Sequence, residues 1–161
     1  EMSCVSVMGL DDLLSPKGVI HNLRARCKRE ALQALAESAS DLVGRPASEI
    51  MSTLLEREQL GSTGVGDGVA LPHGKMDGLN KIVGVLAQLE TPVSFDAVDD
   101  QPVDLIFMLL APANATAAHL KALAKVSRLL RDSDARDALR GADTPEALFA
   151  IATADQKHHA A

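Results

Sequence analysis

Residues 61–75 read GSTGVGDGVALPHGK, a glycine-rich loop followed by a short apolar run and one histidine, His73. The glycines before the run allow backbone conformations that other residues avoid, and they let main-chain N–H groups approach a ligand closely. Val69-Ala70-Leu71 predicts a short buried strand, and Pro72 restricts the backbone just before the histidine. The segment therefore predicts a site for an anion, with an imidazole ring held beside it.

The same segment differs from a nucleotide-binding P-loop, which it resembles at first sight. Five residues separate Gly68 from Gly74-Lys75, where the P-loop motif has four. Met76 stands where that motif needs a serine or threonine to bind magnesium. We therefore expect no nucleotide site here.

The chain resembles a known family over about residues 10–152. The resemblance is to the IIA components of the phosphoenolpyruvate-dependent phosphotransferase system, in the fructose/mannitol-type branch and especially its nitrogen-regulatory type. It lies in the order and spacing of Arg57-Glu58, Gly61-Ser62-Thr63-Gly64, Leu71-Pro72-His73-Gly74-Lys75 and His119. It implies that His73 carries a phosphoryl group.

Two further residues take their expected function from the resemblance. Arg57, in the last turn of a predicted helix, could simply be a cation favoured by the helix dipole, but the resemblance implies that it neutralises phosphate oxygens. His119 would by itself be read as a surface residue, and the resemblance makes it a second ring that donates an N–H to phosphate. The remaining candidates for binding phosphate are Ser62, Thr63, Gly64 and Gly74.

The chemistry expected at His73 is phosphoryl transfer. An imidazole with a pKa of about 6.5 offers a neutral nitrogen lone pair near physiological pH, and the transfer depends chiefly on in-line approach and charge neutralisation. The resemblance implies that His73 accepts the group from the phosphohistidine of a small HPr/NPr-like carrier protein, without cofactor or metal. The protein would be a phosphotransferase component and not a stand-alone enzyme. A docking carrier predicts an apolar rim, with Val65, Val69 and Leu71 as candidates.

The later fate of the phosphate separates several interpretations. A nitrogen-regulatory type signals through its phosphorylation state to targets such as potassium-transport or sensor-kinase components. A sugar-specific type passes the phosphate to a IIB cysteine in fructose or mannitol uptake. The chain carries no fused IIB or membrane domain, which favours regulation. Outside this family, it could be an interaction module with a structural His73, or a metal hydrolase built on His73 and His119, although no Asp or Glu stands at motif spacing to complete the ligands.

Composition sets the class of protein. With 161 residues and 47% apolar content, the chain is expected to form one domain with a core at about residues 10–152 and a polar tail at 153–161. A net charge of -6, mixed cations and anions, and the absence of Tyr and Trp predict no basic stripe and no nucleic-acid binding. Cys4 and Cys27 form no disulfide framework, and no secretory signal or membrane-length apolar run occurs. We therefore expect a cytoplasmic protein without membrane insertion.

Hydrophobic periodicity predicts an α/β (α+β) fold. Strands are expected at 19–23, 69–71, 81–87 and 103–110, and helices at about 27–39, 46–57, 116–131, 135–140 and 144–152. The 103–110 run is continuously apolar after Asp104, which is typical of a strand covered on both faces. We expect a three-layer α/β/α sandwich with helices on both faces of a mixed sheet, for which the resemblance implies four or five strands. The 116–131 helix, capped by Asn114 or Thr116, is expected to bury Leu120, Leu123, Ser127 and Leu130.

Overall fold

The computed structural model describes residues 9–160, and side chains within residues 9–154. In this part of the chain it has five α-helices, two short 3-10 helices and one six-stranded sheet. The helices are α1 (Lys28–Val43), α2 (Ala47–Gln59), α3 (Thr116–Arg131), α4 (Ser133–Gly141) and α5 (Pro145–Ala160), with the 3-10 turns η1 (Leu10–Asp12) and η2 (Pro16–Gly18). The strands are β1 (Val19–Leu23), β2 (Gly64–Gly66), β3 (Val69–Ala70), β4 (His73–Met76), β5 (Val83–Val93) and β6 (Val103–Pro112).

The sheet is mixed, as predicted, and is built around β6. Its strand order is β1-β5-β6-β3-β2, with β4 also paired to β6. β5 runs antiparallel to β6, whereas β3 and β4 both lie parallel to it along one edge. Pro72 divides this edge into two short strands because it has no N–H to donate, although its carbonyl still accepts from the Leu109 N–H at 3.0 Å. This division contributes to a count of six strands where four or five were expected.

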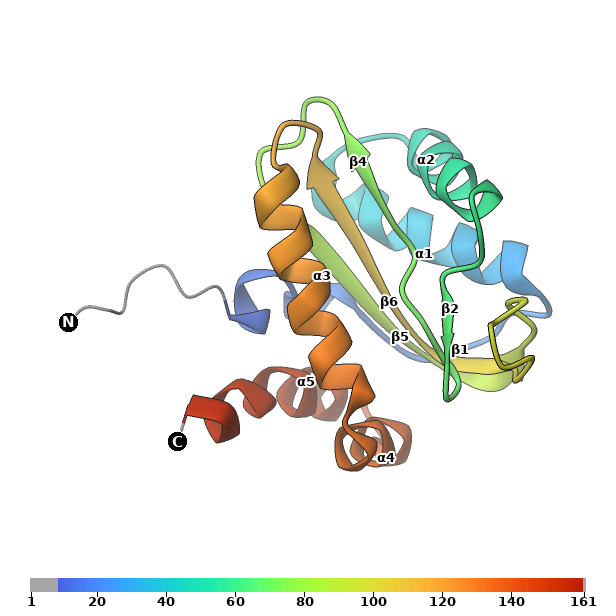
Figure 1. Cartoon of the computed structure of the whole chain (residues 1–161), viewed down its shortest axis with the longest axis vertical. Helices are drawn as coiled ribbons and strands as arrows, with labels where there is room; N and C mark the ends of the chain where they lie inside the picture. Colours follow the sequence, from blue (N-terminus) through green and yellow to red (C-terminus); the bar gives the residue numbers. More distant parts are fainter. Residues whose placement is uncertain (1–8, 161) are drawn as a thin grey trace.

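The core has two layers, one on each face of the sheet. Along β6, Leu105, Phe107 and Leu109 are fully buried in the cluster that contains α3 and α5. The alternate residues Ile106 and Met108 are fully buried in the cluster that contains α1 and α2. Figure 1 shows the two groups of helices on opposite sides of the sheet. The predicted three-layer α/β/α architecture is confirmed.

Several boundaries differ from the sequence expectation. Pro46 is the residue before α2 and not its first helical residue. β5 continues through Val93, beyond the predicted end at residue 87, and α5 continues past 152 to Ala160. Cys27 is exposed and free, whereas Cys4 and the side chains of the expected tail from residue 155 lie outside the description. Among the described residues, no helix has the length and apolar character needed to cross a bilayer.

The buried face of α3 is shifted by one position along the sequence from the predicted face. The buried residues are His119, Ala122, Val126, Leu129 and Leu130, and Leu120 is 62% exposed. Both sets recur at helical spacing, so periodicity alone does not choose between them. The predicted stripe left out His119, which the family resemblance had placed in the site, and the structure buries this histidine on the inward face. The predicted cap was also wrong, because Ala115 precedes the helix and no side chain caps it.

Candidate functional site

His73 begins β4, where the parallel register with β6 holds its backbone opposite Leu109. Its ring Nδ1 lies 2.8 Å from the Leu71 carbonyl oxygen. Because a carbonyl can only accept, the proton is assigned to Nδ1, and Nε2 keeps its lone pair. The lone pair of Nε2 is thus the free acceptor position of a partly exposed ring.

Arg57 contacts that nitrogen from the last turn of α2. Its Nε donates to Nε2 of His73 at 3.2 Å, and its Nη1 donates to the Gly61 carbonyl oxygen at 2.9 Å. The first bond is consistent with the assigned tautomer, since the guanidinium can only donate. The guanidinium therefore joins the loop at residue 61 to Nε2 of His73.

His119 comes from the fourth position of α3 and is 4% exposed. Its ring packs edge-on against that of His73, with centroids 5.6 Å apart and an interplanar angle of 69°. Among the described residues, its Nε2 is buried without a hydrogen-bond partner. A buried polar atom left unsatisfied costs about 1–3 kcal/mol, so this atom is a candidate to bind a ligand.

Both rings are held in the neutral form. Burial lowers the pKa of His73 below its usual value of 6.5 and the Arg57 charge lowers it further, while the Leu71 hydrogen bond and Glu58 partly oppose the shift. Burial also lowers the pKa of His119, with additional contributions from His73 and Lys75. Near pH 7, Nε2 of His73 is therefore available as a nucleophile without prior loss of a proton.

The two rings and Arg57 line an open cavity of about 370 Å³, together with Lys75, Gly74 and the apolar side chains of Leu60 and Leu120. Lys75 donates to the Thr116 hydroxyl at 3.1 Å. A larger cavity of about 560 Å³ lies beside Arg24 and Arg26. Both of those arginines are already paired with glutamates, so the histidine cavity is the better candidate for binding an anion.

The apolar rim differs from the one expected. Val69 and Leu71 are only 1% and 8% exposed, so they were wrong candidates, and Val65 is 53% exposed but does not line the cavity. Leu60 and Leu120 are 84% and 62% exposed and do line it. Val69 is buried because it pairs with Leu105 inside the sheet.

Three of the predicted phosphate-binding residues make internal contacts instead of lining the cavity. The Ser62 hydroxyl donates to the Phe95 carbonyl at 2.5 Å and accepts from the Gly64 N–H at 3.0 Å. Thr63 is 3% exposed and bonds to Glu58 through both its N–H and its hydroxyl. A phosphate-binding function for Ser62, Thr63 and Gly64 stays a prediction.

Glu58 is a supporting residue whose function sequence reasoning missed. Besides bonding to Thr63, its carboxylate pairs with Lys28 at 2.7 Å, and its side chain is 6% exposed. It therefore links the first turn of α1, the last turn of α2 and the loop that Arg57 contacts. The sequence signal was its place next to Arg57 in the family stretch, which does not reveal these partners.

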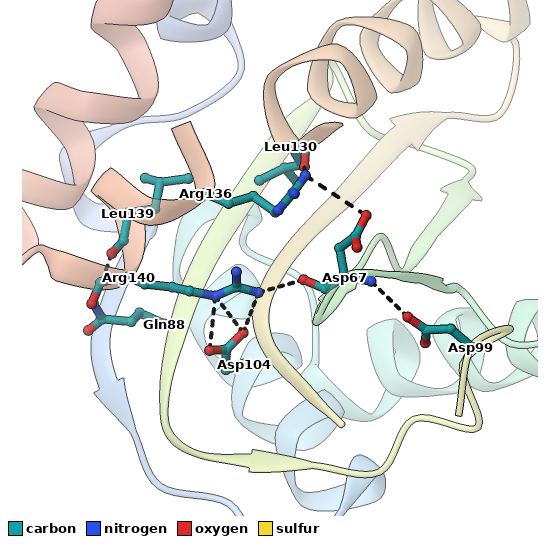
Figure 2. A network of polar contacts seen from close by, with 8 residues as sticks. All are labelled: Asp67, Gln88, Asp99, Asp104, Leu130, Arg136, Leu139 and Arg140. Carbon is teal, nitrogen blue, oxygen red and sulfur yellow. Dashed lines mark hydrogen bonds and ion pairs between the residues drawn. The ribbon is translucent and has the colours of Figure 1, made fainter. Parts of the chain in front are cut away.

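The middle of the 61–75 segment is held by the network in Figure 2. Arg140 of α4 donates to both carboxylate oxygens of Asp104 at 2.9–3.1 Å and to the Asp67 carbonyl at 2.6 Å. Gly68, with φ of 78°, packs so closely against this guanidinium that a side chain would collide with it. Gly68 therefore serves a tight turn, whereas the sequence analysis had expected the glycines to approach an anion.

Gly74 packs against α2 as well as lining the cavity. A Cβ at this position would collide with Cγ2 of Thr53. The Thr53 hydroxyl in turn donates to the Glu49 carbonyl at 3.1 Å. The missing side chain thus lets β4 lie directly on the helix that carries Arg57.

We expect Gly74→Ala to lower the free energy of unfolding by about 1–3 kcal/mol because overpacking pushes α2 away from β4. Phosphorylation of His73 should slow as well, since Arg57 moves with the helix. Urea unfolding measures the first effect. The matched variant Gly74→Ala/Thr53→Ser removes the colliding methyl group and should recover most of the loss, with Thr53→Ser alone completing the double-mutant cycle. Equal stability of wild type and Gly74→Ala would contradict this account.

The sequence relationships agree with this geometry. The sequence model described as "Phosphoenolpyruvate-dependent sugar phosphotransferase system, EIIA 2" matches residues 12–154. The chain belongs to this EIIA family. The resemblance expected from Arg57, His73 and the glycine-rich loop is thereby confirmed.

Individual EIIA relatives include nitrogen-regulatory proteins. The chain is 46% identical to the nitrogen regulatory protein of Bradyrhizobium diazoefficiens over 144 residues, covering 89% of this chain and 94% of that protein. The crystal structure of nitrogen regulatory protein IIA-Ntr from Neisseria meningitidis superposes with a TM-score of 0.85 at 32% identity, covering 89% of this chain and 99% of that one. IIA mannitol from Escherichia coli shares the fold, with a TM-score of 0.72 at 22% identity over 85% and 96% of the two chains.

A metal-hydrolase function finds little support in this EIIA domain. Within the described part of the chain, no three His, Cys, Asp or Glu residues lie together so that they could hold a metal ion. His73 and His119 thus lack a third protein ligand there, and catalytic zinc sites use three.

Proposed function

We propose that this protein is a phosphoryl carrier and regulator of a nitrogen-related phosphotransferase system. In this proposal, Nε2 of His73 takes a phosphoryl group from the phosphohistidine of an HPr/NPr-like carrier, and the phosphorylation state is the signal. The observation that carries it is the lone pair of Nε2, which contacts the Arg57 guanidinium at 3.2 Å in an open cavity.

The transfer requires no proton to move at His73. The Nε2 lone pair forms the new bond to phosphorus, and the bond from phosphorus to the carrier's histidine breaks with its electron pair returning to that ring. The Nδ1 proton stays in place, hydrogen-bonded to the Leu71 carbonyl at 2.8 Å. Because the donor already has an activated N–P bond, neither nucleotide nor metal enters the step.

The oxygens of the bound phosphoryl group carry about two negative charges near pH 7. In this proposal Arg57 shifts its donors from Nε2 to the phosphoryl oxygens, and the free Nε2 of His119 donates an N–H to them. Lys75, which also lines the cavity, adds a third source of positive charge. Such fixed donors are the usual means of stabilising phosphoryl transfer.

The surface around the cavity supports docking of a protein donor. Leu60 and Leu120 are exposed apolar side chains that line the same cavity as the two rings, and apolar contacts of this kind are suited to a transient protein interface. The names of the nitrogen-regulatory relatives favour regulation over sugar uptake. The proposed targets are potassium-transport and sensor-kinase components, which the protein would bind in the cytoplasm.

The test is incubation of the purified protein with a phosphorylated HPr/NPr-like carrier. We expect the intact mass to increase by one phosphoryl group, the adduct to be labile in acid and stable in alkali, and fragmentation to place it on His73. Unphosphorylated carrier is the control. Absence of an adduct would favour the interaction module, and an adduct on another residue would also overturn the proposal.

A further inference from the structure

Helix α3 has a charge composition unlike that of the rest of the chain. The whole sequence contains 16 Lys and Arg against 22 Asp and Glu. α3 contains four of these cations and none of the acidic residues. The sequence analysis had expected no basic stripe because the net charge is negative and cations and anions are mixed along the chain, and α3 corrects that expectation.

Five of the seven exposed residues of α3 follow one face of the helix. They recur at spacings of three and four, which is the repeat of a single helical face. We call this face the basic stripe, and its exposed members are Ala117, Lys121, Ala124, Arg128 and Arg131. The buried residues on the other side of the helix pack in the cluster that contains Leu105 and Phe107 of β6, so the stripe faces away from the sheet. Figure 1 shows α3 lying along one face of the sheet.

The cations of the stripe lack ionic partners. Within the side chains that the structure describes, Lys121, Arg128 and Arg131 form no ion pair or hydrogen bond, whereas Arg24, Arg26, Arg45, Arg136 and Arg140 are all paired with carboxylates. The helix dipole favours Arg128 and Arg131 in the last turn. It does not account for Lys121 in the second turn, where a cation gains little from the dipole. Like charges along one face are mildly unfavourable for the isolated helix.

The shape and chemistry of the stripe point to one kind of occupant. Ala117 and Ala124 are small, so the backbone of another helix can approach closely between the cations, and the exposed Leu120 offers an apolar contact beside them. Lys121 lies about two turns before Arg128, and Arg128 about one turn before Arg131, so carboxylates at the same spacings on a second helix match these cations. A nucleic acid is disfavoured by the net charge of -6 and the absence of Tyr and Trp. A membrane surface is disfavoured because alanines supply little apolar area to insert.

We propose that the basic stripe of α3 docks an acidic α-helical segment of a partner protein. The proposal rests on the charge and exposure of α3 and is independent of whether His73 is phosphorylated. Its test therefore uses unphosphorylated protein, so that its failure would leave the proposed phosphoryl transfer untouched.

The probe is a synthetic, fluorescein-labelled helical peptide with glutamates on one face and alanine and leucine on the other. Its counterpart carries lysine in place of each glutamate. Fluorescence anisotropy should show binding of the acidic peptide that weakens with added salt, and no binding of the lysine peptide. In NMR spectra of the protein, the acidic peptide should shift the amide signals of residues 117–131.

The decisive comparison is between two charge-matched variants. Lys121→Glu/Arg128→Glu should weaken binding of the acidic peptide by about tenfold or more, because two attractive contacts become repulsive. Lys17→Glu/Arg29→Glu changes the same residue types at exposed positions away from α3 and should stay within about twofold. Thermal melts followed by circular dichroism establish that each variant folds, and Lys121→Gln/Arg128→Gln replaces the first variant if it does not.

Three results would overturn the proposal. Equal losses in the two variants would mean that binding follows net charge alone. Amide shifts outside residues 117–131 would place the peptide on another surface. Stripe-dependent binding of phosphatidylglycerol vesicles or duplex DNA, without binding of the acidic peptide, would assign the stripe to a different class of partner.

Discussion

His73→Ala is expected to abolish phosphorylation by the carrier, whereas His119→Ala is expected to slow it by about 10²–10³-fold and still yield the adduct. The two rings differ because Nε2 of His73 provides the attacking lone pair, while His119 provides only a donor to the developing charge. Loss of the nucleophile leaves nothing to form the bond. Loss of one preorganised donor typically costs about 10²–10³ in rate.

Phosphorylation kinetics followed by intact mass measure this difference. His119→Gln should recover part of the rate, because its amide can also donate an N–H into the cavity. His21→Ala, on β1, should react like wild type and serves as the control. An adduct of normal yield in His73→Ala, or complete loss only in His119→Ala, would show that the assignment of the two rings is reversed.

Arg57→Ala is expected to slow phosphorylation of His73 by about 10²-fold or more. The guanidinium supplies the positive charge closest to Nε2, at 3.2 Å, and in-line transfer depends on neutralising the phosphoryl oxygens. Arg57→Lys should recover only part of the rate, because an ammonium cannot reproduce the paired donors of a guanidinium. Rates at saturating and limiting carrier separate slower chemistry from weaker docking.

An NMR titration supplies an independent measurement on the same variant. Because the Arg57 charge helps to lower the pKa of His73, Arg57→Ala should raise the pKa of that ring toward its usual value. Burial is the largest cause of the lowered pKa and is still present in the variant. A change in rate without any change in pKa would mean that Arg57 acts on docking and not at the ring. Wild-type kinetics in Arg57→Ala would contradict its proposed function altogether.

Much of the fold was predictable because its signals are local. The apolar run from residue 103 predicted a strand covered on both faces, and β6 lies between two helical layers. The helix carrying Arg57 and the strand leading to His73 were also expected, since hydrophobic spacing and the proline and glycine positions act over a few residues. The predicted number of strands and the predicted ends of helices were less accurate, because strand pairing and tertiary packing determine both.

The candidate site was predictable only in part. The family resemblance singled out Arg57, His73 and His119, and the structure brings all three to one cavity. It did not reveal that Thr63 bonds to Glu58, that Ser62 bonds to a main-chain carbonyl, or that Gly74 packs on Thr53. In each of these contacts, the local sequence around one residue does not indicate which residue it will contact.

By itself the sequence determined the chemistry available to this protein: a histidine that follows a glycine-rich loop, an arginine that precedes the loop, and a continuous apolar run that builds a strand covered on both faces. Only the tertiary structure decided which face of α3 turns inward, and thus that His119 is buried beside His73 while Leu120 and the cations of the basic stripe are exposed. Two rotations of α3 about its axis, which differ in the face turned toward the sheet, satisfy its apolar periodicity equally well. Packing of α3 against β6 chooses between them, because that contact depends on residues in both elements.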